Sequence, residues 1–328
     1  MLLSLGFTGS TPLPDTFPGV DACEEFGLHG VWSAEHVGLN DALVPSTTYA
    51  TRTKNIELGL MGLNADTRSP GVLAMEIATL NSIAPGRLRL HVGVGSPQRA
   101  RSIGVTDKRT LEGVEVFVSV MRKLLRGEAV TGESEAFRLV DMKVTTAASD
   151  VSAVPIDIMA IRPRMTALAA RVADGLSLSV ASSHDYLSKQ VTLAEEVLDS
   201  EGRDRSAFRV SAAVLACIDD NLDSARHRFG TMLAGFPLAS APMAYEGLEV
   251  PDADLIAETI RSKGIEAAGE LFRPETLDGL GLVSTLAGLP DAIRAYREDG
   301  IDELIVILTA PPSQHRGLVE AISHAGSN

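Results

Sequence analysis

The chain has 328 residues, of which 45% are hydrophobic and only 4% are aromatic, so its core is predicted to be large and aliphatic. Its 43 acidic residues outnumber the 29 basic residues and give a formal net charge of −14. Such a surface repels phosphate backbones and anionic lipids, which excludes nucleic acids and membranes as expected partners and leaves a small-molecule substrate.

Short β-rich runs alternate with helical patterns, at intervals of about 26 to 31 residues in the first half of the chain. This alternation predicts parallel strands joined by right-handed crossovers. Eight such units favour a closed (β/α)8 TIM barrel over an open doubly wound sheet, which usually has about five or six strands. The eight predicted strands begin near Leu2, Gly30, Ile56, Arg87, Pro155, Gly175, Phe208 and Glu303.

Two of the connecting helices have clear boundaries. Ser69 is a predicted N-cap before Pro70, which the first helical position tolerates, and an apolar face then continues to Ala84. Residues 111–125 repeat apolar side chains at helical spacing, and Gly127 is predicted to end this helix.

Two intervals between predicted strands are too long for a simple crossover. Residues 128–153 are predicted to form a small hairpin or an irregular insert, and residues 236–285 contain helical patterns near 252–268. In barrels such excursions often build walls and lids over the site. We therefore predict a single TIM-barrel domain, residues 1–328, that carries these two inserts.

The active site of a β/α barrel lies at the carboxyl ends of the strands. Glu35 and His36 directly follow the second strand, in the stretch GVWSAEHVGL. Because imidazole titrates nearest to neutral pH, His36 is predicted to donate or accept a proton, the alternative being a histidine that satisfies a loop carbonyl. Glu35 is predicted to act in catalysis, to orient a partner or to anchor the second strand.

Glycines and polar residues follow the third and fourth strands, where they would converge on the same mouth. The stretch GVGSP, residues 93–97, lacks the last glycine of a GxGxxG motif, so it is weak evidence for dinucleotide binding. It still provides backbone that a ligand can approach closely. The candidate residues here are Gly62, Leu63, Asn64, Gly95 and Ser96.

The stretch AIRPRM, residues 160–165, follows the fifth strand. Pro163 stands where a helix would begin, and a helix N-terminus binds anions through its free N–H groups and its dipole. Arg162 and Arg164 flank this proline, so the turn is either a phosphate site or a place for ordinary surface arginines.

The other histidines and the cysteines carry weaker signals. His91 lies inside the fourth strand and is predicted to be structural, and His184 is predicted to cap the helix that follows it. Surface positions are expected for His29, His227, His315 and His324. No HxxxH, HExxH or cysteine cluster is present, so no metal site is expected, and the two isolated cysteines, Cys23 and Cys217, fit a reducing cytoplasm.

Several ordered stretches resemble the bacterial-luciferase-like superfamily of flavin- and deazaflavin-dependent oxidoreductases. EEFGLHGVWSAEHVG is similar to its second-strand segment, and residues 56–97 are similar to its third and fourth units, with the patterns T-R-x-P, S-x-G-R and GxG. The resemblance covers roughly residues 20–180 and is greatest to the methylenetetrahydromethanopterin reductase-like branch. It implies the deazaflavin coenzyme F-420 (F420) as cofactor, with FMN in the neighbouring monooxygenase branch, and a homodimer.

The resemblance also implies roles for individual residues. His36 would lie near the reactive centre of the cofactor ring, and a non-prolyl cis peptide would press behind the ring at Gly62–Leu63. Asn64 would face the polar edge of the ring, and Gly95 and Ser96 would approach the cofactor tail. The turn that would bind its phosphate comprises Ala160, Arg162, Pro163, Arg164 and Met165.

Two positions depart from the family pattern. Arg162 replaces the usual glycine before Pro163, and Val37 replaces the second histidine of the EHH form. We predict an F420-dependent oxidoreductase that transfers a hydride to or from a small organic substrate, with His36 as proton shuttle. The alternatives are an FMN-dependent luciferase-like monooxygenase and a non-catalytic relative that has lost tight cofactor binding.

Overall fold

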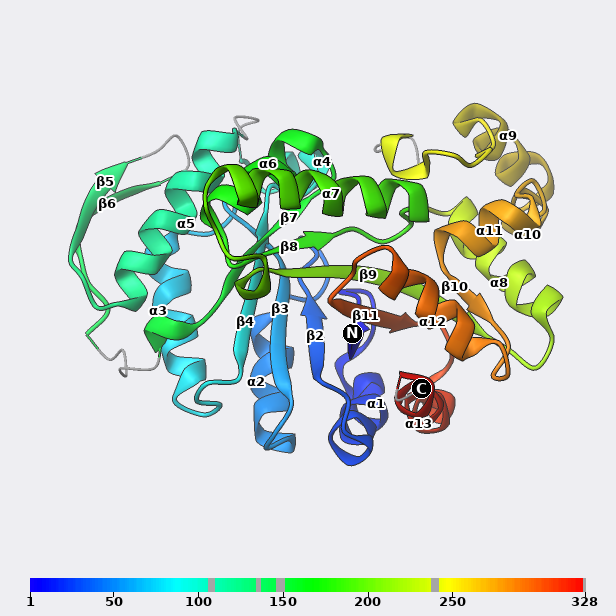
Figure 1. Ribbon diagram of the computed structural model, residues 1–328, viewed down its shortest axis with the longest axis horizontal. Coiled ribbons are helices and arrows are strands. Elements are labelled where there is room, and N and C mark those ends of the chain that lie inside the picture. The colour runs from blue at the N-terminus through cyan, green and yellow to red at the C-terminus, as the bar shows by residue number, and fades with distance from the viewer. Residues whose placement is uncertain (106–109, 134–136, 146–150, 237–241, 327–328) are drawn as a thin grey trace.

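Eight parallel strands close into a barrel, and the helices that connect them surround it (Figure 1). This computed structural model describes residues 1–105, 110–133, 137–145, 151–236 and 242–326. The pairings β11–β1 and β8–β9 close the ring, so the predicted (β/α)8 barrel is confirmed, and each strand begins within one residue of its predicted start. The barrel strands are β1 (Leu2–Phe7), β2 (Gly30–Ala34), β3 (Glu57–Asn64), β4 (Leu88–Gly93), β7 (Ile156–Ala160), β8 (Gly175–Leu178), β9 (Arg209–Ile218) and β11 (Glu303–Leu308).

The helices of the outer layer follow the strands in chain order, and α13 returns beside α1 (Figure 1). None of the helices in the described residues combines the length and the apolar character needed to cross a bilayer. The helices are α1 (Leu13–Phe26), α2 (Leu43–Arg52), α3 (Pro70–Asn81), α4 (Pro97–Ser102), α5 (Leu111–Leu125), α6 (Pro163–Val172), α7 (His184–Ser200), α8 (Leu222–Ala234), α12 (Leu289–Glu298) and α13 (Pro312–Gly326).

The two helices with predicted boundaries behave differently at their ends. Ser69 is the N-cap of α3, as predicted, although its side chain makes no capping hydrogen bond. The helix ends at Asn81, earlier than predicted, because the N–H groups of Ser82 and Ile83 bond carbonyls only three residues back and tighten the last turn. Helix α5 has the predicted bounds, and Gly127 follows it with the left-handed φ of 73° expected of a terminating glycine.

The apolar core lies mainly between the barrel and its helices, and a small second cluster fills the barrel itself. This inner cluster consists of Trp32, Ala34, Met61 and Ile305. Trp32 fits because its neighbour on β3 is Gly59, where an added Cβ would lie 1.9 Å from the indole ring. The centre of the barrel is therefore packed with side chains and is not a pore.

Below the inner cluster, the amino-terminal end of the barrel is closed by charged side chains, which we call the floor network: Glu57, Arg89, Asp157, Arg209 and Glu303. Arg89 donates two hydrogen bonds to Asp157, at 2.6 and 2.8 Å. Arg209 bridges Glu57 and Glu303, at 2.7 and 3.1 Å. Each residue is the first or second of its strand, so the network lies opposite to the carboxyl ends.

Both predicted inserts are present. The first contains an antiparallel hairpin of β5 (Val130–Glu133) and β6 (Arg138–Met142), while residues 134–136 and 146–150 lie outside the described residues. The second is helical, and α9 lies at the outer edge of the molecule beside α10 and α11 (Figure 1). Its strand β10 pairs with the end of β9 and was not predicted, because three residues are too few to show alternation. The second insert contains η4 (Pro242–Tyr245), α9 (Ala253–Lys263), α10 (Ile265–Gly269), α11 (Pro274–Leu280) and β10 (Leu282–Ser284).

Candidate active site

His36 is fixed at the carboxyl end of β2 by contacts with the loop that follows β1. Its ring Nδ1 accepts a hydrogen bond from the Gly9 N–H at 3.1 Å, and its backbone N–H donates to the Asn40 carbonyl. Only glycine fits at position 9, since a Cβ there would lie 2.9 Å from the imidazole Nδ1. Because Nδ1 accepts this bond, the neutral ring carries its proton on Nε2.

The neighbouring Glu35 is held in an ion pair. Its side chain is 7% exposed, and Arg68 donates to it through both Nε and Nη2, the latter at 2.5 Å. Arg68 also contacts Glu76 at 3.1 Å. Burial alone would lower the pKa of Arg68, but Glu35 and Glu76 raise it, so the guanidinium stays charged. This cluster ties the end of β2 to the β3–α3 loop and to α3.

Strand β3 ends in a bulge at Gly62. The pairing of β3 with β4 shifts register between Leu60 and Leu63, and Gly62 has a left-handed φ of 78°. Its N–H points at the Met159 sulfur, 3.2 Å away, and a Cβ would lie 2.6 Å from the Glu35 carbonyl oxygen. The predicted cis peptide at Gly62–Leu63 is wrong: the bond is trans, because the glycine's positive φ alone produces the bulge.

Three further candidates lie around this bulge. The Asn64 amide lies against Gly95, where a Cβ would lie 2.5 Å from it, and Gly95 has a left-handed φ of 54°. Ser96 is exposed and is the N-cap of the short helix α4. Leu63, in contrast, is completely buried and points into the outer core. The structure thus leaves Asn64, Gly95 and Ser96 at the mouth of the barrel and gives the Leu63 side chain a packing role.

The AIRPRM stretch forms the start of α6, as predicted. Arg162 is the N-cap, Pro163 begins the helix, and both are exposed, as is Arg164. Ala160 and Met165 are buried on either side of the turn. Among the described residues, no ion pair involves Arg162 or Arg164. Two guanidinium groups therefore flank the positive end of a helix of ten residues, with their charges turned to solvent.

One strained residue at the mouth escaped sequence analysis. Ala181, in the loop after β8, has a φ of 56° although it is not glycine, and it is 2% exposed. Its conformation is held by the residues that follow: the Ser183 N–H donates to the Ala244 carbonyl, and the Ser183 hydroxyl donates to the Glu246 carbonyl. A left-handed alanine costs on the order of 1–2 kcal/mol and has no signature in sequence.

The remaining histidines lie outside this mouth. His91 is completely buried inside the barrel, as its strand position predicted, with Nε2 3.1 Å from Asp157 and its ring on Trp32. The prediction that His315 lies on the surface is wrong: it is 3% exposed, since α13 packs it against Phe7.

The capping prediction for His184 is also wrong. The Ser183 hydroxyl caps α7 by accepting from the Tyr186 N–H, because it is the residue just before the helix that can reach the free amides. His184 contacts Asp299 instead, with 2.5 Å between Nδ1 and Oδ2.

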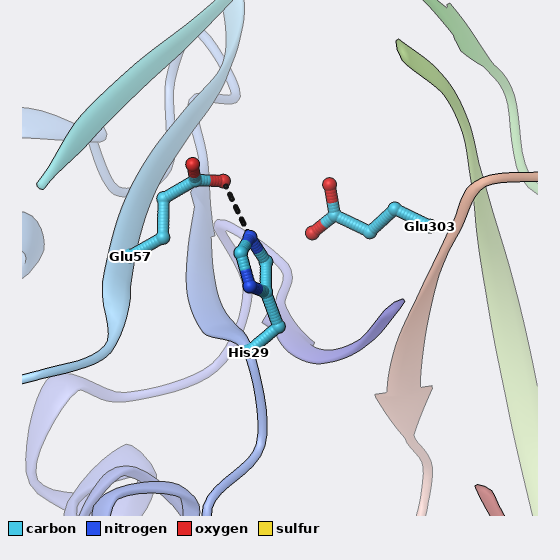
Figure 2. Close-up of side chains that lie close together, drawn as sticks. All are labelled: His29, Glu57 and Glu303. Atoms are coloured by element: carbon cyan, nitrogen blue, oxygen red, sulfur yellow. Dashed lines mark ion pairs between the residues drawn. The ribbon is translucent and has the colours of Figure 1, made fainter. Parts of the chain in front are cut away.

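One group of potential metal ligands occurs among the described residues: His29, Glu57 and Glu303, whose ligand atoms lie within 4.8 Å of one another (Figure 2). It belongs to the floor network and not to the mouth. Arg209 already supplies a positive charge to both carboxylates. Glu303 accepts further hydrogen bonds from Ser4 and Trp32, at 2.6 and 2.8 Å. These partners satisfy the carboxylates without a metal ion.

The mouth therefore combines a fixed imidazole, a half-buried backbone bulge, an amide beside a glycine and a positively charged helix start. These groups come from the carboxyl ends of β2, β3, β4 and β7, which are neighbours in the barrel. Such an arrangement suits a flat ligand that carries a phosphate group, with a proton donor beside it.

Comparison with known proteins agrees with the fold. The profile of the family described as luciferase-like monooxygenase matches residues 8–303. The 5,10-methylenetetrahydromethanopterin reductase of Archaeoglobus fulgidus is 26% identical over 280 residues, which is 84% of this chain and 82% of that protein. The F420-dependent glucose-6-phosphate dehydrogenase of Kineococcus radiotolerans is 32% identical over 193 residues, or 55% of this chain and 57% of that protein.

A solved structure has the same fold along the whole chain. The coenzyme F420-dependent tetrahydromethanopterin reductase of Methanopyrus kandleri superposes with a TM-score of 0.85. The superposition covers 99% of this chain and 97% of that one, at 18% sequence identity. At this identity the likeness establishes the barrel architecture, inserts included, and nothing finer.

Proposed function

This chain belongs to the family of luciferase-like monooxygenases and is an oxidoreductase, and on that premise we propose that it uses coenzyme F420 to reduce or oxidise a small organic substrate. Its F420-dependent sequence relatives support F420 over FMN. When bound, the deazaflavin supplies the hydride chemistry, while the protein supplies position, charge and a proton.

The residues at the mouth fit such a cofactor. The bulge at Gly62 requires glycine, because a Cβ would lie 2.6 Å from the Glu35 carbonyl oxygen, and its bare backbone is proposed to lie against the cofactor ring. Gly95 is likewise required because the Asn64 amide packs directly against it, and this amide can both donate and accept hydrogen bonds. The single observation that carries the proposal is this bare, left-handed bulge beside His36 in a chain of this family.

His36 is proposed as the proton donor and acceptor. The bond from the Gly9 N–H to Nδ1 leaves the mobile proton on Nε2, and a protonated ring would point an N–H at an N–H. This contact therefore favours the return of the imidazole ring to its neutral state after each proton transfer. Positioned acid–base groups of this kind contribute about 10²- to 10⁴-fold to a reaction rate.

Glu35 is proposed as a positioning residue. Both of its oxygens face Arg68, which leaves it poorly placed to exchange a proton with a substrate. The ion pair fixes the backbone just before His36 and also fixes the Glu35 carbonyl, which packs on Gly62.

The start of α6 is proposed to bind the cofactor phosphate. The helix N-terminus and the two exposed arginines, Arg162 and Arg164, provide positive charge on a chain whose net charge is −14. Members of this superfamily usually have glycine at the position of Arg162. Here the arginine would replace backbone contacts to the phosphate with a charge-assisted hydrogen bond.

Separate fluorescence titrations with F420 and with FMN test the cofactor. We expect saturable F420 binding at least about tenfold tighter than FMN binding, a difference of roughly 1.4 kcal/mol. The double variant R162Q/R164Q should weaken binding of F420, whereas an equal loss of charge at R261Q and R294Q, on exposed helix faces, should not. Preference for FMN would assign the protein to the monooxygenase branch, and binding of neither would contradict the proposal.

We also propose a homodimer that uses the outer face of α3. This helix is apolar on most of its faces, yet Val72 and Met75 are 47% and 49% exposed, and Val44 of the adjacent α2 is 59% exposed. Exposed apolar side chains that gather on two adjacent helices indicate a covering partner. Light scattering should show a dimer that M75K dissociates and L255K, on exposed α9, leaves intact; a monomeric wild type would contradict this.

A further inference from the structure

A cavity of about 850 Å³ lies at the amino-terminal end of the barrel, opposite to the proposed active site. Its wall includes Leu2 at the start of β1, Arg209 at the start of β9 and Asp302 just before β11. A volume of this size is ample for a small organic molecule. Neither His36 nor any other residue of the mouth lines it.

The wall of this basal cavity is rich in arginine, and several of these arginines are paired with carboxylates. Arg205, for example, contacts Asp302 and Glu195 at 2.9 and 3.0 Å. Among the described residues the wall includes five arginines and two carboxylates, Asp174 and Asp302. This excess of positive charge occurs on a chain whose net charge is −14. The five arginines are Arg89, Arg122, Arg205, Arg209 and Arg297.

The carboxylates that neutralise two of these arginines lie behind the wall. Arg89 is paired with Asp157, and Arg209 with Glu57 and Glu303, all members of the floor network inside the barrel. None of these three carboxylates lines the cavity. A ligand in the cavity therefore meets the guanidinium groups of Arg89 and Arg209 before the carboxylates that pair with them.

The arginines at the rim keep donor capacity. Within the part of the chain that the structure describes, Arg122 makes its contacts through Nη2, to Asp174 at 2.8 Å and to the Val172 carbonyl at 3.2 Å. Arg297 makes one long contact within the described residues, 3.5 Å from Nη2 to the Gly326 carbonyl. A guanidinium has five N–H donors in a planar fork, so each keeps donors for an oxyanion.

We propose that the basal cavity is a binding site for a multivalent oxyanion, a compound with two or more phosphate or carboxylate groups. Several guanidinium groups around one space match such a ligand because each forms charge-assisted, often bidentate hydrogen bonds with an oxyanion. A monovalent anion would engage only part of the wall. This site is independent of the proposed redox function, since it lies at the other end of the barrel.

Isothermal titration of the whole protein with inorganic pyrophosphate, and separately with citrate, at matched ionic strength tests the site. We expect saturable one-to-one binding of at least one of the two, which also distinguishes phosphate from carboxylate ligands. R122Q and R297Q should each weaken binding by about tenfold, the effect of losing charge-assisted hydrogen bonds. Each has a matched control nearby on the chain: Arg126, the C-cap of α5, is paired with Glu128, and Arg294, within α12, is paired with Asp291.

R126Q and R294Q remove the same charge without touching the cavity, so binding should stay within about twofold of the wild type. The double variant R162Q/R164Q locates the ligand, because pyrophosphate bound at the start of α6 would be lost there and pyrophosphate in the basal cavity would not. The proposal is overturned if neither anion saturates, if the controls weaken binding as much as R122Q and R297Q, or if R162Q/R164Q abolishes it. Two rim variants on separate helices keep the test valid should one of them fail to fold.

Discussion

At the amino-terminal end of the barrel, Arg89 and Asp157 have side chains that are 6% and 0% exposed and that contact each other through two hydrogen bonds. At the carboxyl end, Arg162 and Arg164 are exposed, and no ion pair involves them within the described residues. The same residue type thus forms a buried ion pair at the base of one end and is exposed at the other.

The backbone differs between the two ends in the same way. At the floor the parallel pairing is regular: β9 with β11 and β7 with β8 pair without a shift, and β3 with β4 is regular from Leu58 to Leu60. The mouth contains a register shift next to Gly62 and a left-handed alanine at position 181. Strain of this kind costs stability and persists where the surroundings impose it, which is typical of ligand sites. The comparison indicates that the floor stabilises the fold, whereas the strained backbone of the mouth lowers stability and positions the candidate site residues.

The largest expected effect comes from breaking the floor. Replacing Arg89 by Met should lower the free energy of unfolding by about 3–5 kcal/mol, because Asp157 would remain buried without a positively charged partner. Chemical denaturation measures this loss. R261M is the control, since Arg261 pairs with Glu258 at 70% and 63% exposure and such pairs contribute at most about 1 kcal/mol. Equal losses in the two variants would contradict the structural role of the floor.

His36→Ala tests the mouth. Turnover should fall by at least about 100-fold because the proton donor is gone, while the affinity for F420 should stay within about tenfold and the melting temperature nearly constant. Steady-state rates with F420 and a panel of small alcohols and carbonyl compounds measure the first quantity, and fluorescence titration the second. H227A, which removes an exposed histidine from α8, should match the wild type. Unchanged turnover in H36A would reject the proton-shuttle assignment.

The comparison of the two ends also explains what the sequence could predict. The eight strands and the candidates of the mouth are signalled by local patterns, because apolar runs give the strands and barrel topology gathers whatever follows their carboxyl ends. His36 was found in this way, as was the helix start at Pro163.

The floor network could not be predicted, because its partners are far apart in the chain. Arg89 pairs with Asp157 across 68 positions, and Arg209 with Glu57 across 152. Each of these residues looks, in its own strand, like a charge interrupting an apolar run. The Arg68 anchor of Glu35 belongs to the recognisable T-R-x-P pattern, yet the pattern does not say which carboxylate it contacts. Ala181 carries no local signal at all.

A smaller effect is expected from Gly62→Ala. The added Cβ would lie 2.6 Å from the Glu35 carbonyl oxygen at a φ of 78°, so we expect a loss of about 1–3 kcal/mol in unfolding free energy together with weaker F420 binding. G86A is the matched control, because Gly86 has a φ of 70° and open space around its Cβ position. The G86A variant therefore measures how much free energy of unfolding is lost when alanine adopts a left-handed backbone without a steric clash. Identical behaviour of the two variants would show that the close approach at Gly62 is unimportant.

The smallest expected effect is a difference between the two ends of the barrel in how their contributions to stability depend on pH. Burial lowers the pKa of His315, against the opposing influence of the Ala310 carbonyl and Asp15, so the unfolded chain binds a proton more readily than the folded one. Its contribution to stability is therefore present above the unfolded pKa of about 6.5 and is lost as the pH falls through the lowered value. Burial raises the pKa of Asp157, but His91 and Arg89 lower it further, so the floor keeps its contribution above about pH 4 and loses it only in stronger acid. Denaturation midpoints measured between pH 7 and 3 should fall in two steps. The H315N variant should lose the first step and keep the second. Loss of the second step in H315N would mean that the two ends are not independent.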